Sequence, residues 1–395
     1  MTKAEIIDAA FKVWGRNYYR KTSLSQLAAE LKVCKPALYR HFFNKQALTK
    51  AMAERFFDDF AAFIKVDLNK ALDEDVDEGI SSILKSISCF FAGNVNALIF
   101  SLINLYDRSM DSRTITDSMK SRGADIGIIQ MLVEKKYSCD PILTRLIFAT
   151  LTFLMSHYHM VNKSMENPPS EAKIKDITCL ICNTINSGLG YSSSETEIDF
   201  EKLEKQVEGM PLNAEPEMFF KAVAEAVAQA GPWDVSMNMV AKKLGLSKSS
   251  LYVHFKNKKD MLRRLFITEF KNIIVFTKQG ISLSSNTSEQ LYLGIYTISV
   301  YLRARPEVLV AMDWIRTRKL ELGKPDKNLE IFRLFEDVDI KLLQGTADDE
   351  KQRTSHWILF LLVNVLISMT LHKTQNNCIR ILFKFIFQGL GGFKK

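Results

Sequence analysis

The sequence lacks the motifs by which many enzymes are recognised. It has no phosphate-binding loop, no glycine-rich dinucleotide turn, no nucleophile elbow and no paired-carboxylate motif. Only 6 cysteines are scattered over 395 residues, without the dense spacing of a disulfide-stabilised scaffold. These absences favour a protein that is not an enzyme, uses no cofactor and works in a reducing cytoplasm.

Long hydrophobic runs are missing too. The longest are residues 141–161, interrupted by Arg145, and residues 357–371, about fifteen residues. A membrane-spanning helix needs roughly 20 predominantly apolar residues. We therefore expect buried helices and no membrane partner. Charged residues within the first eight positions also make the N-terminus unlike a signal peptide.

Two clusters imitate metal sites without completing one. The acidic run Asp73–Asp77 resembles the start of a calcium loop, but Glu78 occupies the position of its obligatory glycine. Cys179 and Cys182 lie three residues apart on one face of a predicted helix, but within an apolar stripe. Thiols in such stripes are more often core residues than ligands. We predict no metal site.

An internal repeat is the most informative feature of the chain. Residues 31–45 (LKVCKPALYRHFFNK) and residues 244–258 (LGLSKSSLYVHFKNK) are identical at eight of fifteen positions, without a gap, at an offset of 213. Three earlier matches share that offset: Ala9/Ala222, Ser23/Ser236 and Ala28/Ala241. A duplication of this kind fixes the architecture, so two similar halves are expected.

Each copy predicts three short helices and the start of a fourth. In the first copy, apolar spacing predicts a helix over residues 3–16, Ser23 caps a second, and Pro36 suits the first turn of a third over residues 35–42. In the second copy, Gly245 supplies the positive φ of the turn and Ser247 the cap. Two short helices joined by a tight turn form a helix-turn-helix, whose second helix enters the DNA major groove.

Positive charge gathers on the two copies. Residues 1–57 hold eleven Lys/Arg against four Asp/Glu, and residues 218–271 hold ten against four. The whole chain has a net charge of +8, so the remainder is acidic. Solvated helix faces would account for charge alone. Together with the motif, the distribution favours contact with the phosphates of double-stranded DNA.

Both copies resemble the DNA-binding domain of tetracycline-repressor-like (TetR-family) transcriptional regulators. That family's signature is a capping residue followed by Lys-x-x-Leu-Tyr-x-His-Phe-x-x-Lys, and residues 247–258 (SKSSLYVHFKNK) fit it throughout. Residues 34–45 depart at Cys34, where Ser or Thr is usual, and Lys32 replaces the turn glycine. The resemblance covers about 55 residues in each half.

The recognition helices are predicted to carry the DNA contacts. Residues projecting from the start of each helix are expected to read bases: Lys35, Pro36, Ala37 and Arg40, and Lys248, Ser249, Ser250 and Val253. Residues at family positions that usually touch phosphate are Tyr39, Lys45, Tyr252 and Lys258. Those that hold the helices to their neighbours are Leu38, Phe42, Leu251 and Phe255. For His41 and His254, packing or phosphate contact is favoured over base reading. The plainer alternative is a helix surface with no DNA role.

The expected fold is all-α, with two tandem copies of a helix-turn-helix domain followed by a helical regulatory and dimerisation domain. The predicted domains are residues 1–57 (the first unit), 58–190, a linker over 191–215, 216–271 (the second unit) and 272–395. Within the linker, residues 198–207 are a possible short helix. Helices are also predicted over residues 290–304, 308–320 and 329–343. The resemblance implies that residues 141–161 with 174–187, and 354–372 with 377–388, pair the two halves.

The resemblance implies a transcriptional regulator, most often a repressor relieved by a small apolar effector. Polar residues in apolar helices either line an effector pocket or face solvent: Asn104, Asp107, Asp313, Arg316 and Asn364. We expect an intramolecular pseudo-dimer on an asymmetric operator, because Arg40 can donate two hydrogen bonds to a guanine and Val253 cannot. The alternatives are an effector-binding or protein-docking module that no longer binds DNA, and a tandem chain that dimerises further.

Overall fold

Helices account for nearly all of the regular structure, and the predicted all-α class is confirmed. The computed structural model describes residues 2–16, 23–106, 112–137, 141–162, 170–212, 218–310, 312, 333–343, 350–372 and 377–395. Within those ranges there is no strand, and extended pairing is limited to an isolated bridge between Tyr137 and Lys394.

The first half contains ten helices in its described part. They are α1 (Lys3–Arg16), α2 (Leu24–Glu30), α3 (Lys35–Tyr39), α4 (Lys45–Lys70), α5 (Val76–Gly93), α6 (Val95–Tyr106), α7 (Ser112–Lys120), α8 (Gly127–Lys136), α9 (Pro141–Asn162) and α10 (Glu171–Ser187). The expected helix over residues 3–16 is confirmed. Helix α3 ends at Tyr39, three residues earlier than expected, although Arg40 still has helical φ and ψ.

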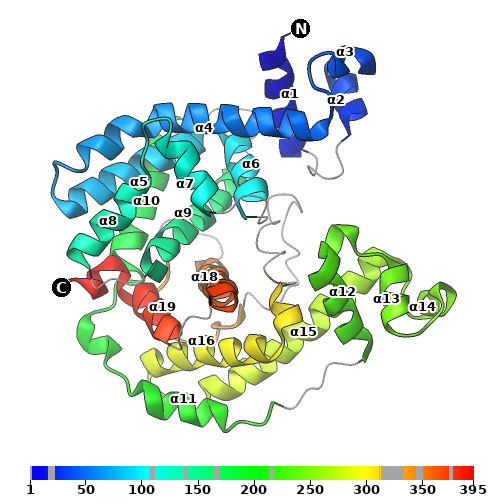
Figure 1. Ribbon diagram of the computed structural model, residues 1–395. Helices are drawn as coiled ribbons and strands as arrows, with labels where there is room; N and C mark the ends of the chain where they lie inside the picture. The colour runs from blue at the N-terminus through cyan, green and yellow to red at the C-terminus, as the bar shows by residue number, and fades with distance from the viewer. Residues whose placement is uncertain are drawn as a thin grey trace.

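The described part of the second half repeats part of this order after a connecting helix. Its elements are η1 (Ser193–Thr196), α11 (Phe200–Glu208), α12 (Met218–Asp234), α13 (Met237–Lys243), α14 (Lys248–His254), α15 (Lys258–Ile281), α16 (Thr287–Ala304), α18 (Glu350–His372), α19 (Asn377–Gln388) and η3 (Gly389–Phe393). Figure 1 shows the first half above the second, with α9, α18 and α19 between them.

One predicted helix is wrong where it is described. Residues 333–343 form turns and then an irregular segment, whereas the sequence was expected to be helical over 329–343. Burial alternates over residues 338–341: Val338 and Ile340 are buried, and Asp339 and Lys341 are exposed. That period of two is the pattern of an extended chain lying on a core. The remainder of that prediction, and most of residues 308–320, lies outside the described residues.

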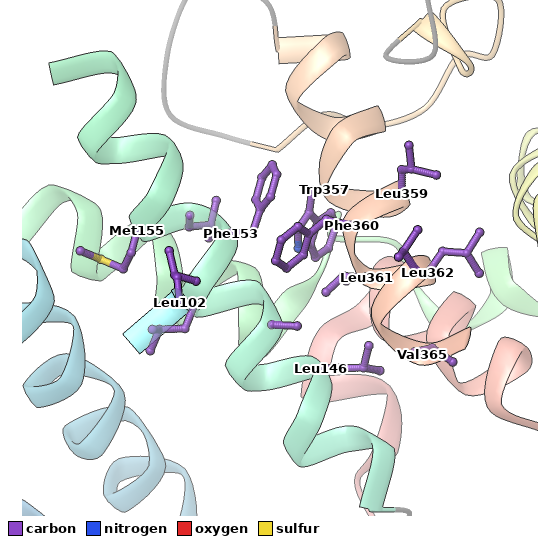
Figure 2. Close-up of a cluster of buried hydrophobic side chains, with 14 of the residues drawn as sticks. Leu102, Leu146, Phe153, Met155, Trp357, Leu359, Phe360, Leu361, Leu362 and Val365 are labelled. Carbon is purple, nitrogen blue, oxygen red and sulfur yellow. The ribbon is translucent and has the colours of Figure 1, made fainter. Parts of the chain in front are cut away.

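The two halves share one hydrophobic interface. Helix α9 of the first half faces α18 of the second, and Figure 2 shows Phe153 pointing toward Trp357 and Phe360 across it. The Phe153 and Phe360 rings lie 5.4 Å apart, and all three side chains are buried. Trp357 Nε1 donates to Thr150 Oγ1 at 3.2 Å, which satisfies the polar atom of the indole inside the core.

A reciprocal backbone contact joins the ends of α10 and α19. A Cβ added to Gly188 would lie 2.7 Å from the nitrogen of Gly389, and one added to Gly389 would lie 2.5 Å from the nitrogen of Ser187. Both glycines have positive φ, 57° and 55°. Leu189 N donates to Ile386 O at 2.8 Å across the same contact. Only glycine permits both this backbone and this approach.

Each half also reaches over the other beyond that crossing. Lys341 N donates to the Tyr191 hydroxyl at 2.7 Å, and Lys341 Nζ lies 4.3 Å from the centre of the Tyr191 ring. At the other end, Lys394 forms the isolated bridge with Tyr137. The segment after α10 thus contacts the segment before α18. In the same way, the segment after α19 contacts the segment before α9.

Much of the predicted linker is docked on the second half. Its helix, expected over residues 198–207, is α11, and it buries Leu203 and Val207 against α16. Arg380 donates to both carboxylate oxygens of Glu204, at 2.8 and 2.9 Å, and the Tyr292 hydroxyl donates to the same carboxylate. A bidentate Arg–carboxylate pair of this kind fixes orientation as well as distance.

Within the described residues, no single helix has the length and apolarity needed to cross a membrane. The pair Val76–Gly93 and Val95–Leu102 meets those criteria only when taken together, and the two helices are bent by 105° at their junction.

Replacing Gly188 by Ala should destabilise the full-length chain by at least about 2 kcal/mol more than replacing Gly190 by Ala. Both positions have positive φ, but a Cβ on Gly190 meets no atom within 4 Å. Gly190→Ala therefore measures the left-handed backbone strain alone, roughly 1 kcal/mol. Urea unfolding of both variants makes the comparison. Equal losses would mean that the two halves do not meet at Gly188.

Docking of α11 should weaken as pH falls below the ordinary glutamate value of 4.5. Burial opposes ionisation of Glu204, but hydrogen bonds from Arg380 and Tyr292 outweigh it and hold its pKa below that value. A lowered pKa stabilises the folded state above the unfolded-state value and is lost on acidification. Hydrogen exchange of α11 amides should accelerate accordingly, and Glu204→Gln should remove this pH dependence. An unchanged acid response in that variant would contradict the assignment.

Candidate nucleic-acid interface

The turn between the two short helices has the same shape in both units. Gly245 has φ of 67°, as the sequence predicted, and Lys32 at the equivalent position has φ of 53°. Among the described residues, Lys32 is the one non-glycine with positive φ. That conformation costs a residue with a Cβ roughly 1–2 kcal/mol. The first unit therefore keeps the turn geometry, but without the glycine that would avoid this conformational strain.

The caps of the recognition helices α3 and α14 differ. Ser247 Oγ accepts from Ser250 N at 3.0 Å, as predicted, whereas Cys34 makes no side-chain capping bond. The preceding helices are capped alike, because Ser23 and Ser236 each accept from the backbone three residues on. The departure at Cys34 thus removes one cap and leaves the rest of the first unit intact.

The residues expected to hold the recognition helices do face the core. Leu38 and Leu251 are 1% and 0% exposed, and Phe42 and Phe255 are buried as well. His254 is exposed, and its ring lies 4.5 Å from the ring of Phe219 on α12. His41 is partly buried.

The predicted DNA-contacting residues lie mainly on the opposite, solvent-facing side. Those that are exposed are Lys35, Pro36, Tyr39, Arg40, Lys248, Ser249, Tyr252 and Val253. Those that are partly buried are Ala37, Lys45, Ser250 and Lys258. Exposure leaves the first group able to meet a duplex. For the partly buried group, contact depends on the side-chain atom that remains accessible.

A lysine and a tyrosine associate identically in both units. Lys35 Nζ lies 5.9 Å from the centre of the Tyr39 ring, and Lys248 Nζ lies 6.0 Å from that of Tyr252. These distances are near the outer limit for a cation–π contact. Each recognition helix therefore presents an ammonium group beside an exposed phenol, a combination suited to phosphate oxygens.

The repeated asparagine has a role that the sequence reasoning missed. Asn44 Oδ1 accepts from Ala47 N at 2.8 Å, and Asn257 Oδ1 accepts from Asp260 N at 2.9 Å. Each asparagine is thus the N-cap of the long helix, α4 or α15, that follows the recognition helix. Asparagine directly before a long helical stretch is a recognisable cap signal. Burial lowers the pKa of Lys45, the first residue of α4.

In the first unit, the long helix α4 is anchored to its half by charged and aromatic contacts. Arg122 Nε donates to Asp58 at 2.6 Å, and its Nη2 donates to Glu54, so it clamps the middle of α4. Phe11 on α1 and Phe100 on α6 pack edge to face at 5.1 Å. The Arg122 contacts therefore hold α4, and the Phe11–Phe100 contact holds α1, to the rest of the first half.

The second unit is anchored by a buried ion pair instead. Arg305 Nη1 donates to Glu269 at 3.0 Å, and the Tyr301 hydroxyl donates to the same carboxylate at 2.7 Å. All three side chains are at most 3% exposed. Removing one partner of such a pair would leave the other charge buried without a counter-ion, which is strongly destabilising. This ion pair therefore stabilises the packing of α15 against α16.

The described residues contain no group of His, Cys, Asp or Glu arranged to hold a metal ion. Burial raises the pKa of Cys182 to about 11, so this thiol is inert near neutral pH. Asn364 is buried on α18. The other effector candidates, Asp107, Asp313 and Arg316, lie outside the described residues, as does the side chain of Asn104. An open cleft of about 600 Å³ at Tyr191 and Lys341 is lined mainly by polar groups, unlike a pocket for an apolar effector.

Comparison with protein families matches both units. The model for bacterial regulatory proteins of the tetR family matches residues 6–52 and 220–265, which contain the two helix-turn-helix segments. The chain carries two tetR-family domains in tandem. The resemblance drawn from residues 34–45 and 247–258 is therefore confirmed, and the repeat is a repeat of this domain.

Similar proteins extend the comparison. The HTH-type transcriptional repressor ComR of Escherichia coli (strain K12) is 31% identical over 119 residues, which cover 30% of this chain and 56% of ComR. The chain thus spans about half the length of the curated relative it matches. The fatty acid degradation regulator FadR from Bacillus halodurans is 14% identical, with 45% of this chain and 98% of FadR covered and a TM-score of 0.32. That score is too low to carry an argument.

Because α3 lacks a side-chain cap and α14 has one, alanine at the cap position should affect the stability of the two tetR-family domains differently. Ser247→Ala should destabilise the second by about 1 kcal/mol because a helix cap is lost. Cys34→Ala should change the first little, and Cys34→Ser should stabilise it by a similar amount. Hydrogen exchange of the amides in α3 and α14 measures each effect locally. Equal losses for the two alanine variants would show that Cys34 caps α3 after all.

Proposed function

We propose that this chain is a DNA-binding transcriptional regulator that reads DNA with both of its tetR-family domains. The observation that carries the proposal is that each domain presents the same exposed lysine and tyrosine, Lys35/Tyr39 and Lys248/Tyr252, on a helix whose other side is buried. The domain matches point to a regulator rather than an enzyme.

The regulator acts as a single-chain pseudo-dimer. In a two-fold dimer, each contact of one subunit is repeated by the other. The contact of Gly188 with Gly389 is reciprocal in this way, and Ile185 O and Ile386 O each lie against the other half's glycine, at the same offset of 201 residues. Residues 58–190 and 272–395 are then the pairing domains, and residues 191–215 link the first of them to the second DNA-binding domain, residues 216–271.

The operator has two unlike halves. Both recognition helices face solvent, but they carry KPALYR in the first unit and KSSLYV in the second. Arg40 has a planar group that can donate to two acceptors of guanine, and Val253 has no donor. A perfect palindrome would not make equal use of both helices, so the preferred site is asymmetric.

Regulation is repression that an effector relieves. The Escherichia coli relative is named a repressor, which supports this direction for the present chain. Helices α4 and α15 connect the DNA-binding domains to the pairing helices, so an effector that alters their separation changes the fit to successive major grooves. Such a ligand must bind the two separations with different affinity, because a ligand indifferent to separation shifts nothing.

A second candidate applies to the first unit alone. Lys32 holds a positive φ and Cys34 leaves α3 without a cap, both of which favour a domain released from selection for DNA binding. In that case residues 1–57 are a docking or effector-sensing module, and the second unit provides all affinity for DNA.

Selection from random duplex DNA by the purified chain tests these proposals. The expected site has two unlike halves whose centres lie about one helical turn apart. The double variants K35A/Y39A and K248A/Y252A should each weaken binding at least roughly tenfold, because phosphate contacts are lost in one half-site. If K35A/Y39A binds like the parent chain, the first unit is a module without DNA contact. If no sequence is enriched, the chain is not a sequence-specific DNA-binding regulator.

A further inference from the structure

The outward side of each recognition helix is defined by its buried leucine. Successive residues of an α-helix are rotated by about 100°, so a residue two positions later points away from the core. Arg40 follows buried Leu38 by two positions, and Val253 follows Leu251 in the same way. Arg40 has φ of −66° and ψ of −26°, so this geometry still applies just past the end of α3. Arg40 and Val253 therefore point outward at equivalent positions of the two units, and both are exposed.

The next outward side chain lies where the chain leaves the recognition helix. It is Phe43 in the first unit, 84% exposed, and Lys256 in the second, which is exposed as well. Lys256 N donates to Asp260 at 3.1 Å, and Asn257 caps α15, so the backbone at this exit is fixed. The exit lies beyond the end of the helix, away from the first residues that enter the groove.

Charged and apolar residues are exchanged between these two positions. The first unit has a cation outward on the helix and an aromatic ring at the exit, whereas the second has an aliphatic side chain on the helix and a cation at the exit. Val253 is 83% exposed, and no described contact covers it or Phe43. An exposed valine on a groove-facing helix matches the C5-methyl group of thymine, and a lysine at the exit matches a phosphate.

We propose that the two units divide base reading and phosphate contact in opposite ways. Arg40 selects guanine in the first half-site, and Val253 selects thymine at the equivalent base of the second. Lys256 contacts a phosphate in the second half-site that Phe43 leaves without a partner in the first. This inference rests on the proposed function, and it names Val253 and Lys256 as determinants of different kinds: one of sequence, the other of affinity.

Reciprocal exchange at each position tests the inference in the full-length chain. The variant R40V/V253R should exchange the base preferences of the two half-sites, with each preference amounting to about tenfold or more. The variant F43K/K256F should leave base preference unchanged and move a phosphate contact from the second half-site to the first. Binding is measured by selection from random duplex DNA and by titration at several salt concentrations.

Single variants make the phosphate assignment quantitative. K256F should reduce the slope of log affinity against log salt by about 0.9, and F43K should increase it by the same amount. The matched control is Val275→Lys, which adds the same charge at a 59% exposed position on α15, away from the recognition helix. This control should leave the slope unchanged. Circular dichroism and melting temperatures of all variants show that folding is retained.

The outcomes separate this inference from the proposed function. If the parent chain selects a site but R40V/V253R leaves both half-sites unaltered, the assignment of base reading is wrong while the regulator remains. If Val275→Lys changes the salt slope as much as F43K does, net charge rather than a contact at the exit sets affinity. If the parent chain selects no site, the proposed function and this inference both fail.

Discussion

The backbones of Gly188 and Gly389 touch where the last helices of the two halves end, and the arrangement of the halves depends on this contact. A side chain on either residue would meet the opposite backbone, so the approach of α10 to α19 is set by the absence of a Cβ. The halves also meet where Trp357 donates to Thr150 inside the core, and where Lys341 and Lys394 contact Tyr191 and Tyr137. The contact is reciprocal, as each contact is in a two-fold dimer, and the proposed pseudo-dimer rests on it.

The departures from symmetry lie away from that contact. The buried group Glu269, Tyr301 and Arg305 of the second half corresponds, at the repeat offset, to Phe56, Ser88 and Ala92 of the first. There Phe56 packs against the rings of Phe60, Phe90 and Phe100 instead. Helix α11 packs against α16 in the second half. At these equivalent positions the two long helices are thus held differently, by a buried ion pair in the second half and by packed aromatic rings in the first.

The fold class, the helix-turn-helix segments, and the turn and cap of the second unit could be predicted from the sequence. They follow from backbone preference, helix capping and apolar spacing, which act between residues close in sequence. Gly245 needs positive φ, Ser247 has a capping oxygen, and Leu251 lies in an apolar stripe. The docking of α11 was not predictable, since the spacing of Phe200, Leu203 and Val207 predicts a helix but not the partner face that receives it. Residues 338–343 were wrongly expected to be helical. Their alternation of apolar and polar residues is too short to indicate an extended chain without knowledge of the core on which they lie. In the candidate site, the sequence was enough to predict which charged residues lie on the exposed side of each recognition helix. The base that Arg40 contacts depends on how the helix lies in the DNA groove, which the sequence does not determine.

The mass of the protein–DNA complex tests the central claim most directly. Sedimentation of the full-length chain with a duplex that carries its selected site measures how many chains occupy one operator. A pseudo-dimer predicts one chain of 45.1 kDa per duplex, with no second chain joining at higher protein concentration. Two chains on every fully occupied duplex would contradict the account, because one chain would then not be sufficient to occupy both half-sites.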